Sequence, residues 1–349
     1  MKALVYHAPH QFSLDDVPVP QIQDPRDAIL RVTLATPCTS DIHILEGHIP
    51  FVRWPITLGH EFCGEIVELG AAVEGFKVGD RVSCLPGVVC NECDMCKSGF
   101  PSFCQHGGCY GNIKDLHGAL AEYIRIPFAA NTMQHIPEGL AEEDVLLAGD
   151  MLGTAWFGIK NAELKKGDTV AVYGVGPVGM CACILAKKVF EAKTVFAVDI
   201  AQYRLDAVKN AGVADYIINS AEEDPVRKIR DITGRRGVNA VVETAGVQST
   251  ITAGARSLGI GGILSTIALF AKPLELPLDL MPNRNLQLKT GIQQCEGVDE
   301  IIELIKEGKI NTRFMLTHRS PLNDIIKALD IFGGNKDGCI KYAITPYER

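Results

Sequence analysis

The chain has 349 residues, of which 47% are hydrophobic, and a formal net charge of −8 at pH 7. This length is enough for two domains with hydrophobic cores of their own. The acidic balance and the lack of a basic run argue against nucleic-acid binding. No stretch approaches the roughly 20 apolar residues of a membrane-spanning helix, and residues 1–10 fit a first strand better than a signal peptide. We therefore expect a cytoplasmic protein with no nucleic-acid or membrane partner.

The N-terminal part of the chain is predicted to be rich in β-strands. Residues 1–35 contain three strand-like runs separated by prolines, and residues 37–43 then form a turn that leads into a short helix. Taken singly, Cys38 would more often be a buried apolar thiol and His43 a solvated helix residue. Together with the Gly-His-Glu stretch at 59–61, however, they form a candidate site for binding a metal and moving protons, composed of Cys38, Ser40, His43, His60 and Glu61.

Four of the twelve cysteines fall within 15 residues, at Cys90, Cys93, Cys96 and Cys104. A cluster of this kind indicates a metal site rather than disulfides. Four thiolates can close a tetrahedron around zinc and leave no open position, so such a site is structural. An iron–sulfur cluster is the alternative, but the seven-residue gap before Cys104 and the lack of a following proline argue against it.

The pattern that organises the rest of the chain lies at 169–199. Thr169–Tyr173 predicts a buried strand, Gly-Val-Gly-Pro-Val-Gly follows at 174–179, and an apolar stretch of helical length leads to a second strand at 194–198. Pro177 suits the first turn of a helix, whose free N–H groups can hold phosphates. This series of elements predicts a dinucleotide-binding site.

Each glycine of this turn has a separate role in such a site. Gly174 makes the tight turn, Gly176 allows a backbone to approach a pyrophosphate, and Gly179 allows the helix to pack on its strand. Asp199 ends the second strand, where a carboxylate can accept hydrogen bonds from an adenosine ribose. Further along, the sequence predicts a helix over 202–210, parallel strands over 240–246 and 262–267, and amphipathic helices over 299–307 and 321–332, the last capped by Ser320.

These motifs, in this order, resemble the zinc-dependent medium-chain alcohol dehydrogenases over essentially the whole chain. Pro-Cys-Thr-Ser-Asp-Ile-His at 37–43 is similar to the bacterial and archaeal secondary-alcohol branch, which often lacks the complete cysteine lobe that is present here. The resemblance implies an α/β fold with a GroES-like β-rich catalytic domain and a doubly wound Rossmann domain. The expected limits are 1–150 and 291–349 for the catalytic domain, with a zinc lobe at about 90–104, and 151–290 for the Rossmann domain.

Carried over to this sequence, the resemblance implies a catalytic zinc held by Cys38, His60 and Asp150. Many family members have a cysteine at the position of Asp150, and the secondary-alcohol branch has an aspartate. As an alternative, Asp150 could cap the helix that follows it, and both roles could hold. Our hypothesis for Glu61 is that it binds the resting zinc and yields to the substrate.

The family also implies roles in proton transfer, substrate contact and cofactor binding. Ser40 would take the alcohol proton and His43 would end the relay, while Tyr110 and Leu269 would lie near the substrate. Relatives that use NADP have a glycine where this chain has Asp199. This sequence therefore departs from them toward NAD. By family position the cofactor would contact Thr154, Gly174, Gly176, Pro177, Val178, Gly179, Asp199, Arg204, Thr244, Ala245 and Ile267.

The resulting prediction is a zinc-dependent oxidoreductase that transfers hydride between an alcohol, secondary by preference, and NAD, giving a ketone or aldehyde. It would hold two zinc ions, one catalytic and one structural, with zinc and nicotinamide in the cleft between the domains, and would assemble as a homodimer or homotetramer. Two alternatives stay open. One is an NAD-dependent polyol or sugar-alcohol dehydrogenase, which usually has Glu where this chain has Asp150. The other is a non-catalytic NAD-binding protein.

Overall fold

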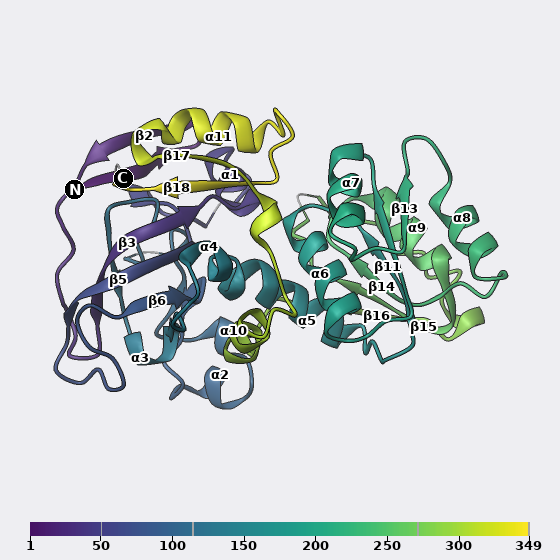
Figure 1. Ribbon diagram of the computed structural model, residues 1–349, viewed down its shortest axis with the longest axis horizontal. Coiled ribbons are helices and arrows are strands. Elements are labelled where there is room, and N and C mark those ends of the chain that lie inside the picture. The colour runs from purple at the N-terminus through teal and green to yellow at the C-terminus, as the bar shows by residue number, and fades with distance from the viewer. Residues whose placement is uncertain (50, 114, 271, 348–349) are drawn as a thin grey trace. The chain divides into compact units, whose positions relative to one another are not determined.

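The computed structural model describes residues 1–49, 51–113, 115–270 and 272–347 and separates into two compact units (Figure 1). Unit 1 comprises Met1–Asp150, Gln294–Lys306 and Leu316–Arg349, and unit 2 comprises Met151–Gln293 and Glu307–Met315. The second crossing thus lies three residues later than expected. Residues 307–315 return to unit 2, where Gly308 and Phe314 line a hollow together with Ile184 and Ala207.

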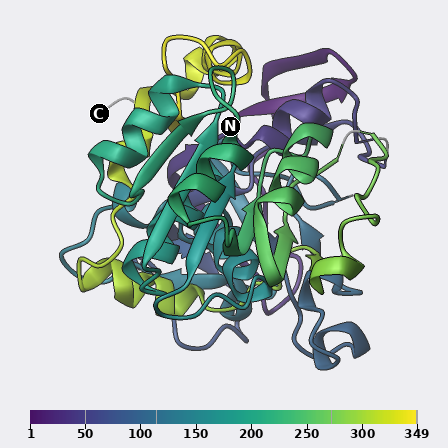
Figure 2. The ribbon, with the colours of Figure 1, turned by 90° about the vertical axis from the view of Figure 1, so that its right-hand side faces the viewer.

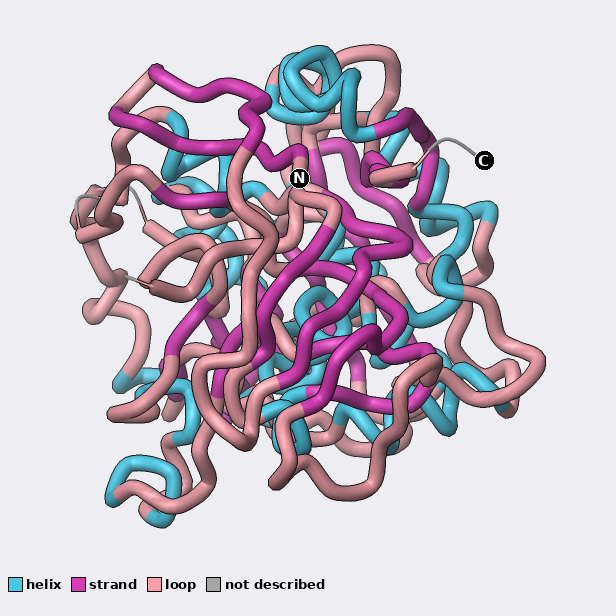
Figure 3. The backbone as a smooth tube through the Cα atoms, turned by 90° about the vertical axis from the view of Figure 1, so that its left-hand side faces the viewer, coloured by secondary structure: helices cyan, strands magenta, loops and turns pink. Residues whose placement is uncertain are grey.

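Unit 1 is built on one large, mostly antiparallel sheet with strand order β10-β6-β5-β3-β18-β17, to which β9 adds by pairing with β3 (magenta in Figure 3). Its strands are β3 (Ala28–Thr36), β5 (Glu61–Leu69), β6 (Arg81–Cys84), β9 (Tyr123–Ile126), β10 (Met133–His135), β17 (Leu316–Pro321) and β18 (Lys341–Thr345). Smaller sheets are formed by β1 (Lys2–Ala8), β2 (Gln11–Asp16) and β4 (Ile56–Thr57), and by β7 (Gly87–Val88) and β8 (Gly108–Cys109).

The helices of unit 1 are short, and the apolar faces of the longer ones pack on its core. They are α1 (Thr39–Leu45), α2 (Asp94–Lys97), α3 (Ala129–Thr132), α4 (Glu142–Val145), α10 (Val298–Lys306) and α11 (Ile325–Gly333). In α11 the buried residues Ile325, Ala328, Leu329 and Phe332 recur at helical spacing and join the main core cluster. The predicted helix start at Ser320 is wrong, because 316–321 pairs with β18 as strand β17.

Unit 2 is a doubly wound α/β unit whose described strands form a six-stranded parallel sheet of order β13-β12-β11-β14-β15-β16. The strands are β11 (Thr169–Tyr173), β12 (Thr194–Asp199), β13 (Tyr216–Asn219), β14 (Val238–Glu243), β15 (Leu258–Thr266) and β16 (Gln287–Thr290). The chain winds outward from β11 in one direction and from β14 in the other, so right-handed crossovers place their helices on opposite faces. This is the strand order of a dinucleotide-binding fold, and the predicted α/β class is confirmed.

Helices cover both faces of this sheet (Figure 2). In Figure 1, α6 and α7 lie on one side of it and α8 and α9 on the other. Their bounds are α5 (Gly153–Asn161), α6 (Pro177–Lys188), α7 (Gln202–Asn210), α8 (Pro225–Ile232) and α9 (Gln248–Ser257). Burial on both faces explains why the central strands β11 and β12 are largely apolar, whereas the edge strand β16 is partly exposed and carries polar residues. Along the part of the chain that the structure describes, none of the helices combines the length and apolar character needed to cross a membrane.

Candidate active site and metal centres

The structure brings Cys38, His60, Glu61 and Asp150 together within unit 1, with one potential ligand atom of each within 4.8 Å of the others. Cys38 caps the N-terminus of α1, Glu61 begins β5, and Asp150 lies in a five-residue π-helical turn at Ala148–Leu152. Single π turns are rare and are frequent at functional sites. The alternative role for Asp150 as a helix cap is wrong, since α5 begins only at Gly153 and the residue before it is Leu152.

Asp41 orients two of these ligands. Its Oδ2 accepts a hydrogen bond from the Cys38 N–H at 2.8 Å, and its Oδ1 lies 3.4 Å from His60 Nδ1. His60 Nε2 then lies 3.5 Å from Asp150 Oδ2. A carboxylate on one imidazole nitrogen fixes the ring so that the other nitrogen can bind a metal. Sequence reasoning missed this role, although the position of Asp41 three residues after the helix cap is a recognisable signal.

Lys341 is a second residue that sequence reasoning missed. Its side chain is fully buried and donates hydrogen bonds to Glu61 Oε1 at 2.6 Å and to the Pro37 carbonyl at 2.7 Å. The other oxygen, Glu61 Oε2, is buried and has no hydrogen-bond partner among the described residues. Because buried polar atoms normally have a partner, this oxygen fits a site that holds a cation.

The charges of the Cys38, His60, Glu61 and Asp150 cluster also fit a site that holds a cation. Burial raises the pKa of the Cys38 thiol and raises that of Glu61 to about 7, against the opposing charge of Lys341. Burial opposes a charge on His60, but Asp41 and other anionic neighbours outweigh it and raise its pKa well above the usual value. A divalent cation would offset the cost of burying these anions. The ligand set of thiolate, imidazole and carboxylate is one that zinc accepts.

The two predicted proton-transfer residues both lie on α1. Ser40 Oγ is 3.3 Å from His60 Nε2, next to the atom that would face a metal. His43 is half-buried, and its Nδ1 lies 3.4 Å from His48 Nδ1. Tyr110, expected near the substrate, is fully buried and packs edge-on against Phe62. Its contact with the substrate stays a prediction.

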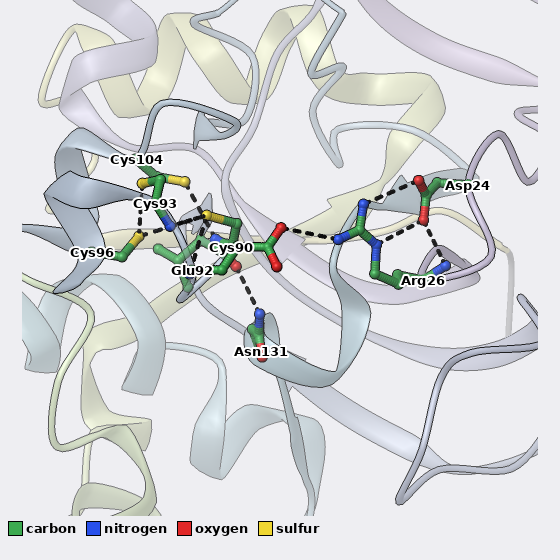
Figure 4. Close-up of polar contacts among 9 residues, drawn as sticks. Asp24, Arg26, Cys90, Glu92, Cys93, Cys96, Cys104 and Asn131 are labelled. Atoms are coloured by element: carbon green, nitrogen blue, oxygen red, sulfur yellow. Dashed lines mark hydrogen bonds and ion pairs between the residues drawn. The ribbon is translucent and has the colours of Figure 1, made fainter.

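The cysteine lobe forms a second cluster, in which the sulfur atoms of Cys90, Cys93, Cys96 and Cys104 converge (Figure 4). The Cys93–Cys96 and Cys90–Cys96 sulfur distances are 3.5 and 3.9 Å. A tetrahedron with zinc–sulfur bonds of about 2.3 Å has edges of about 3.8 Å, whereas a disulfide needs about 2.05 Å. Backbone N–H groups of Cys90 and Cys93 also donate to lobe sulfurs, at 3.3 Å each.

The lobe is attached to the rest of unit 1 by polar contacts (Figure 4). Glu92 points away from the sulfurs and pairs with Arg26 Nη1 at 3.1 Å, while Arg26 Nε binds Asp24 at 2.9 Å. Asn131 Nδ2 donates to the Val89 carbonyl at 3.1 Å, immediately before the first cysteine. The start of the lobe is therefore held in place by contacts that need no ion.

In unit 2, the glycine turn has the expected backbone geometry. Gly174 has a φ of +85°, a conformation that favours glycine. A Cβ on Gly179 would lie 1.9 Å from the Gly174 carbonyl oxygen, so α6 could not pack this closely with another residue there. A Cβ on Gly176, by contrast, would meet nothing within 4 Å. Gly176 caps α6 and Pro177 is its first residue, so space is left at the helix N-terminus for a phosphate group.

Asp199 lies at the carboxyl end of β12 beside this turn. Its Oδ2 accepts from the Val175 N–H at 2.5 Å and its Oδ1 from the Ala201 N–H at 2.8 Å. Arg204 Nη1 is 4.0 Å from Asp199 Oδ2. The acid is therefore fixed next to the glycine turn, as a ribose-binding carboxylate would be.

The other predicted cofactor residues follow strand ends or begin helices of unit 2. Thr244 Oγ1 donates to the Gly174 carbonyl at 2.6 Å, and the Ala245 N–H donates to Glu243 Oε1 at 2.9 Å. Glu243, fully buried, also accepts from Thr266 Oγ1 at 2.9 Å, so it ties the ends of β14 and β15 together. The remaining predicted cofactor residues are Ile267 just after β15, Thr154 in α5 and Val178 in α6. Leu269, predicted to contact the substrate, is exposed and lies beyond β15.

A Rossmann-type unit joined to a β-rich unit with two metal-ligand sets defines a class, the zinc-binding dehydrogenases. Two family models match the chain: the alcohol dehydrogenase GroES-like domain over residues 24–138 and the zinc-binding dehydrogenase over 177–307. The chain belongs to the zinc-type medium-chain alcohol dehydrogenase family, and the predicted GroES-like and Rossmann domains are confirmed.

Named relatives match along nearly the whole chain. An alcohol dehydrogenase of Cupriavidus necator is 35% identical, with 99% of each chain covered. A sorbitol dehydrogenase of Bacillus subtilis is 31% identical, with 99% of this chain and 97% of the relative covered. Among solved structures, the alcohol dehydrogenase of Thermus sp. ATN1 has a TM-score of 0.92 at 30% identity, with 99% of each chain covered. The chain is therefore an oxidoreductase of the alcohol dehydrogenase type.

Structural neighbours have been solved with either nicotinamide dinucleotide. An alcohol dehydrogenase of Escherichia coli CFT073 contains NADH (26% identity, TM-score 0.90), and a zinc-binding dehydrogenase of Sinorhizobium meliloti 1021 contains NADP (25% identity, TM-score 0.87). In both comparisons 99% of each chain is covered.

Proposed function

We propose that this enzyme oxidises secondary alcohols to ketones with NAD and catalyses the reverse reduction. The observation that carries the proposal is the set of Cys38, His60, Glu61 and Asp150 ligand atoms within 4.8 Å of one another. The complete ligand set argues against a non-catalytic nucleotide-binding protein, in which loss of one ligand would be expected.

Cys38, His60 and Asp150 would hold the catalytic zinc. When bound, zinc acts as a Lewis acid that lowers the pKa of a coordinated hydroxyl group, so that hydride can leave the alcohol carbon. Thiolate and carboxylate together balance the charge of Zn²⁺. A carboxylate from Glu61 would bring the total to −1 and disfavour an anionic substrate. We therefore assign Glu61 to the resting ligand set only, with Lys341 holding it at Oε1 when it is displaced.

Ser40 is the group that we assign to the alcohol proton. Its Oγ lies 3.3 Å from His60 Nε2, hence beside the position at which a ligand of the metal would sit. His43, one helical turn further along α1, is the next acceptor in the proposed relay. The pKa of His43 is lowered by burial and by the neighbouring charge of His48, which keeps the ring neutral and able to accept a proton.

We assign NAD rather than NADP as the cofactor. The carboxylate of Asp199 is 7% exposed and is fixed beside the glycine turn by the Val175 and Ala201 N–H groups. A carboxylate held there can accept from the ribose hydroxyls of NAD and would repel the 2′-phosphate of NADP. Arg204 lies 4.0 Å from Asp199, so the positive charge of its guanidinium is offset by the carboxylate. The pair therefore gives the site no net positive charge that would attract a 2′-phosphate.

A second, structural zinc is assigned to the cysteine lobe. The sulfur separations of 3.5 and 3.9 Å support this assignment, and the four ligands leave no position for a substrate. The enzyme would then bind two zinc ions per chain.

A polyol or sugar-alcohol dehydrogenase is the second candidate function, favoured by the sorbitol dehydrogenase among the named relatives. The presence of Asp150 in place of the Glu usual in that group supports the secondary-alcohol assignment instead.

The direct test is turnover with NAD and NADP across a panel of simple secondary alcohols, primary alcohols and polyols. We expect the highest kcat/KM with a secondary alcohol and NAD. A clear preference for polyols would replace the first candidate by the second, and a preference for NADP would refute the assignment of Asp199.

The role of Glu61 is tested separately with cobalt in place of the catalytic zinc. The visible spectrum should change when an alcohol binds in wild-type enzyme but change differently in Glu61→Gln. An identical change in both proteins would mean that Glu61 is not displaced.

A further inference from the structure

A third group of potential metal ligands lies outside both zinc sites, at the C-terminal end of α1. His43, Glu46 and His48 each place one potential ligand atom within 4.8 Å of the other two. His43 Nδ1 is 3.4 Å from His48 Nδ1, and His48 Nδ1 is 3.3 Å from Glu46 Oε2. In the function proposed above, Glu46 has no role and His48 acts only through its charge beside His43.

The backbone, rather than a side-chain contact, brings His48 back over His43. Helix α1 ends at Leu45, and Gly47 follows in the left-handed conformation with a φ of +76°. The Gly47 N–H donates to the Ile44 carbonyl and the His48 N–H donates to the His43 carbonyl, each at 2.9 Å. This pair of bonds is the Schellman motif. The two imidazoles are thus adjacent because of the way the helix terminates.

Gly47 is required at this turn for two reasons. Its positive φ favours glycine, and a Cβ at this position would lie 2.9 Å from the Pro9 Cβ. The segment that carries His48 is therefore packed against the first strand region of unit 1, and the histidine pair does not depend on a flexible loop.

The separations match those between ligands of a tetrahedral zinc ion. Zinc bonds to imidazole nitrogen and carboxylate oxygen are about 2.0–2.1 Å long, so neighbouring ligand atoms lie about 3.3–3.4 Å apart. The distances from His48 Nδ1 to His43 Nδ1 and to Glu46 Oε2, 3.4 and 3.3 Å, have this length. Two histidines and one glutamate are also a known three-residue ligand set of zinc, with the fourth position left to solvent.

The side chains of this group are at least partly exposed to solvent and can bind a cation. The His48 and Glu46 side chains are 51% and 46% exposed, in contrast to the fully buried Glu61. The lowered pKa of His43 leaves its ring in the neutral form that binds metal. Exposed ligands with one open position exchange their ion readily, so this site would fill and empty with the free zinc concentration.

We propose that His43, Glu46 and His48 form a third, exchangeable zinc site, and that its occupation inhibits the enzyme. An imidazole whose Nδ1 binds a metal keeps its remaining proton on Nε2 and has no free lone pair with which to accept another. Zinc at this site would therefore withdraw His43 from proton transfer. The binding claim stands by itself, while the inhibition rests on the role proposed above for His43.

Binding is tested on the intact enzyme loaded with its two zinc ions, by equilibrium dialysis or calorimetric titration with zinc chloride. We expect one further ion per chain in wild type, and zinc affinity weakened more than about 100-fold in His48→Gln, since losing even an outer partner of a ligand costs 10–100-fold. The matched control is His106→Gln, which removes an exposed histidine outside all three clusters and should keep the third ion. Equal zinc binding in wild type and His48→Gln would refute the site.

Inhibition is measured in the same proteins as the activity at each added zinc concentration, relative to the activity of that protein without added zinc. Wild type and His106→Gln should lose activity over the range in which the third ion binds, and His48→Gln should not. Binding of the ion without loss of activity would refute the inhibition. A protein with no turnover on any alcohol would refute the proposed function, but the titration would still decide the site.

Discussion

At the scale of single residues, the fully buried pair of Lys341 and Glu61 determines how the candidate active site is charged. The lysine comes from β18, near the end of the chain, and the glutamate from the start of β5, 280 positions earlier. Burying two charges is costly unless each satisfies the other. Here the lysine also binds the Pro37 carbonyl, next to Cys38. The Lys341 ammonium group therefore holds both the Glu61 carboxylate and the backbone next to Cys38.

We predict that Lys341→Met lowers the free energy of unfolding by about 3–5 kcal/mol, since removing one partner leaves a buried charge uncompensated. The double variant Lys341→Met/Glu61→Gln should be less destabilised than the sum of the two single variants. Urea unfolding of the four proteins measures this coupling. Strictly additive effects would show that the pair does not act as a unit.

Asp41 is predicted to be a positioning residue for the catalytic metal. Asp41→Asn should weaken zinc binding at Cys38 and His60 by about 10–100-fold, because the imidazole loses the carboxylate that fixes its orientation. Competition with a chelator measures the affinity, and Asp16→Asn, at an exposed ion pair, is the control. Unchanged affinity in Asp41→Asn would mean that the contact between Asp41 and His60 is incidental.

Residue types and spacing predicted Cys38, His60 and Glu61 as a candidate site, and the family resemblance added Asp150. Neither predicted the residues that support these four ligands. Lys341 lies in an ordinary strand sequence, and only the pairing of β18 with β3 brings it near Glu61. The prediction for Tyr110 rests on family position alone, and a position along the chain does not show which way an aromatic side chain faces. In this structure it faces the core.

At the scale of elements, two glycines near the turn between β11 and α6 have different roles. Gly179 is needed for packing, whereas Gly176 leaves room for a ligand. We predict that Gly176→Ala folds normally but binds NAD more weakly, because its Cβ would occupy open space at the phosphate-binding helix terminus. Gly179→Ala should lower both stability and NAD binding, since its Cβ would clash with the Gly174 carbonyl. Thermal unfolding with and without NAD measures both effects. Equal stability of the two variants would contradict this distinction.

The cysteine lobe is predicted to hold its zinc independently of the catalytic site. Cys96→Ser should bind one zinc ion instead of two and become more sensitive to proteolysis within 90–104, because the lobe loses its central cross-link. The control is Cys295→Ser, a cysteine outside the metal-ligand groups. Metal analysis and limited proteolysis give the answer. Two zinc ions in Cys96→Ser would argue against the tetrahedral site.

Elements with strong local signals were predicted well, and those decided by long-range pairing were not. The two strands around the glycine turn and the helix α7 lie where the sequence predicts them. The end of β17, Ser320-Pro321, was predicted as the beginning of a helix because Ser-Pro is a typical helix start, whereas the pairing of β17 with β18 is a contact across more than 20 residues. The π turn around Asp150 likewise has no sequence signature.

At the scale of the whole molecule, each unit has a hydrophobic core of its own, one around the sheet of unit 1 and one around the parallel sheet of unit 2. The motifs of the sequence predicted which unit carries which chemistry. They did not predict that residues 307–315 return to unit 2, since that segment carries no motif and its place beside α6 and α7 is a matter of tertiary structure.

The measurement that tests the central claim most directly is the zinc content and NAD-dependent alcohol oxidation of wild type and Cys38→Ser, determined on the same preparations. We predict two zinc ions per chain and turnover in wild type, and one zinc ion without turnover in Cys38→Ser, in which the lobe keeps its ion. A Cys38→Ser enzyme that retained both zinc ions and full activity would show that the chemistry occurs elsewhere than at Cys38, His60 and Asp150.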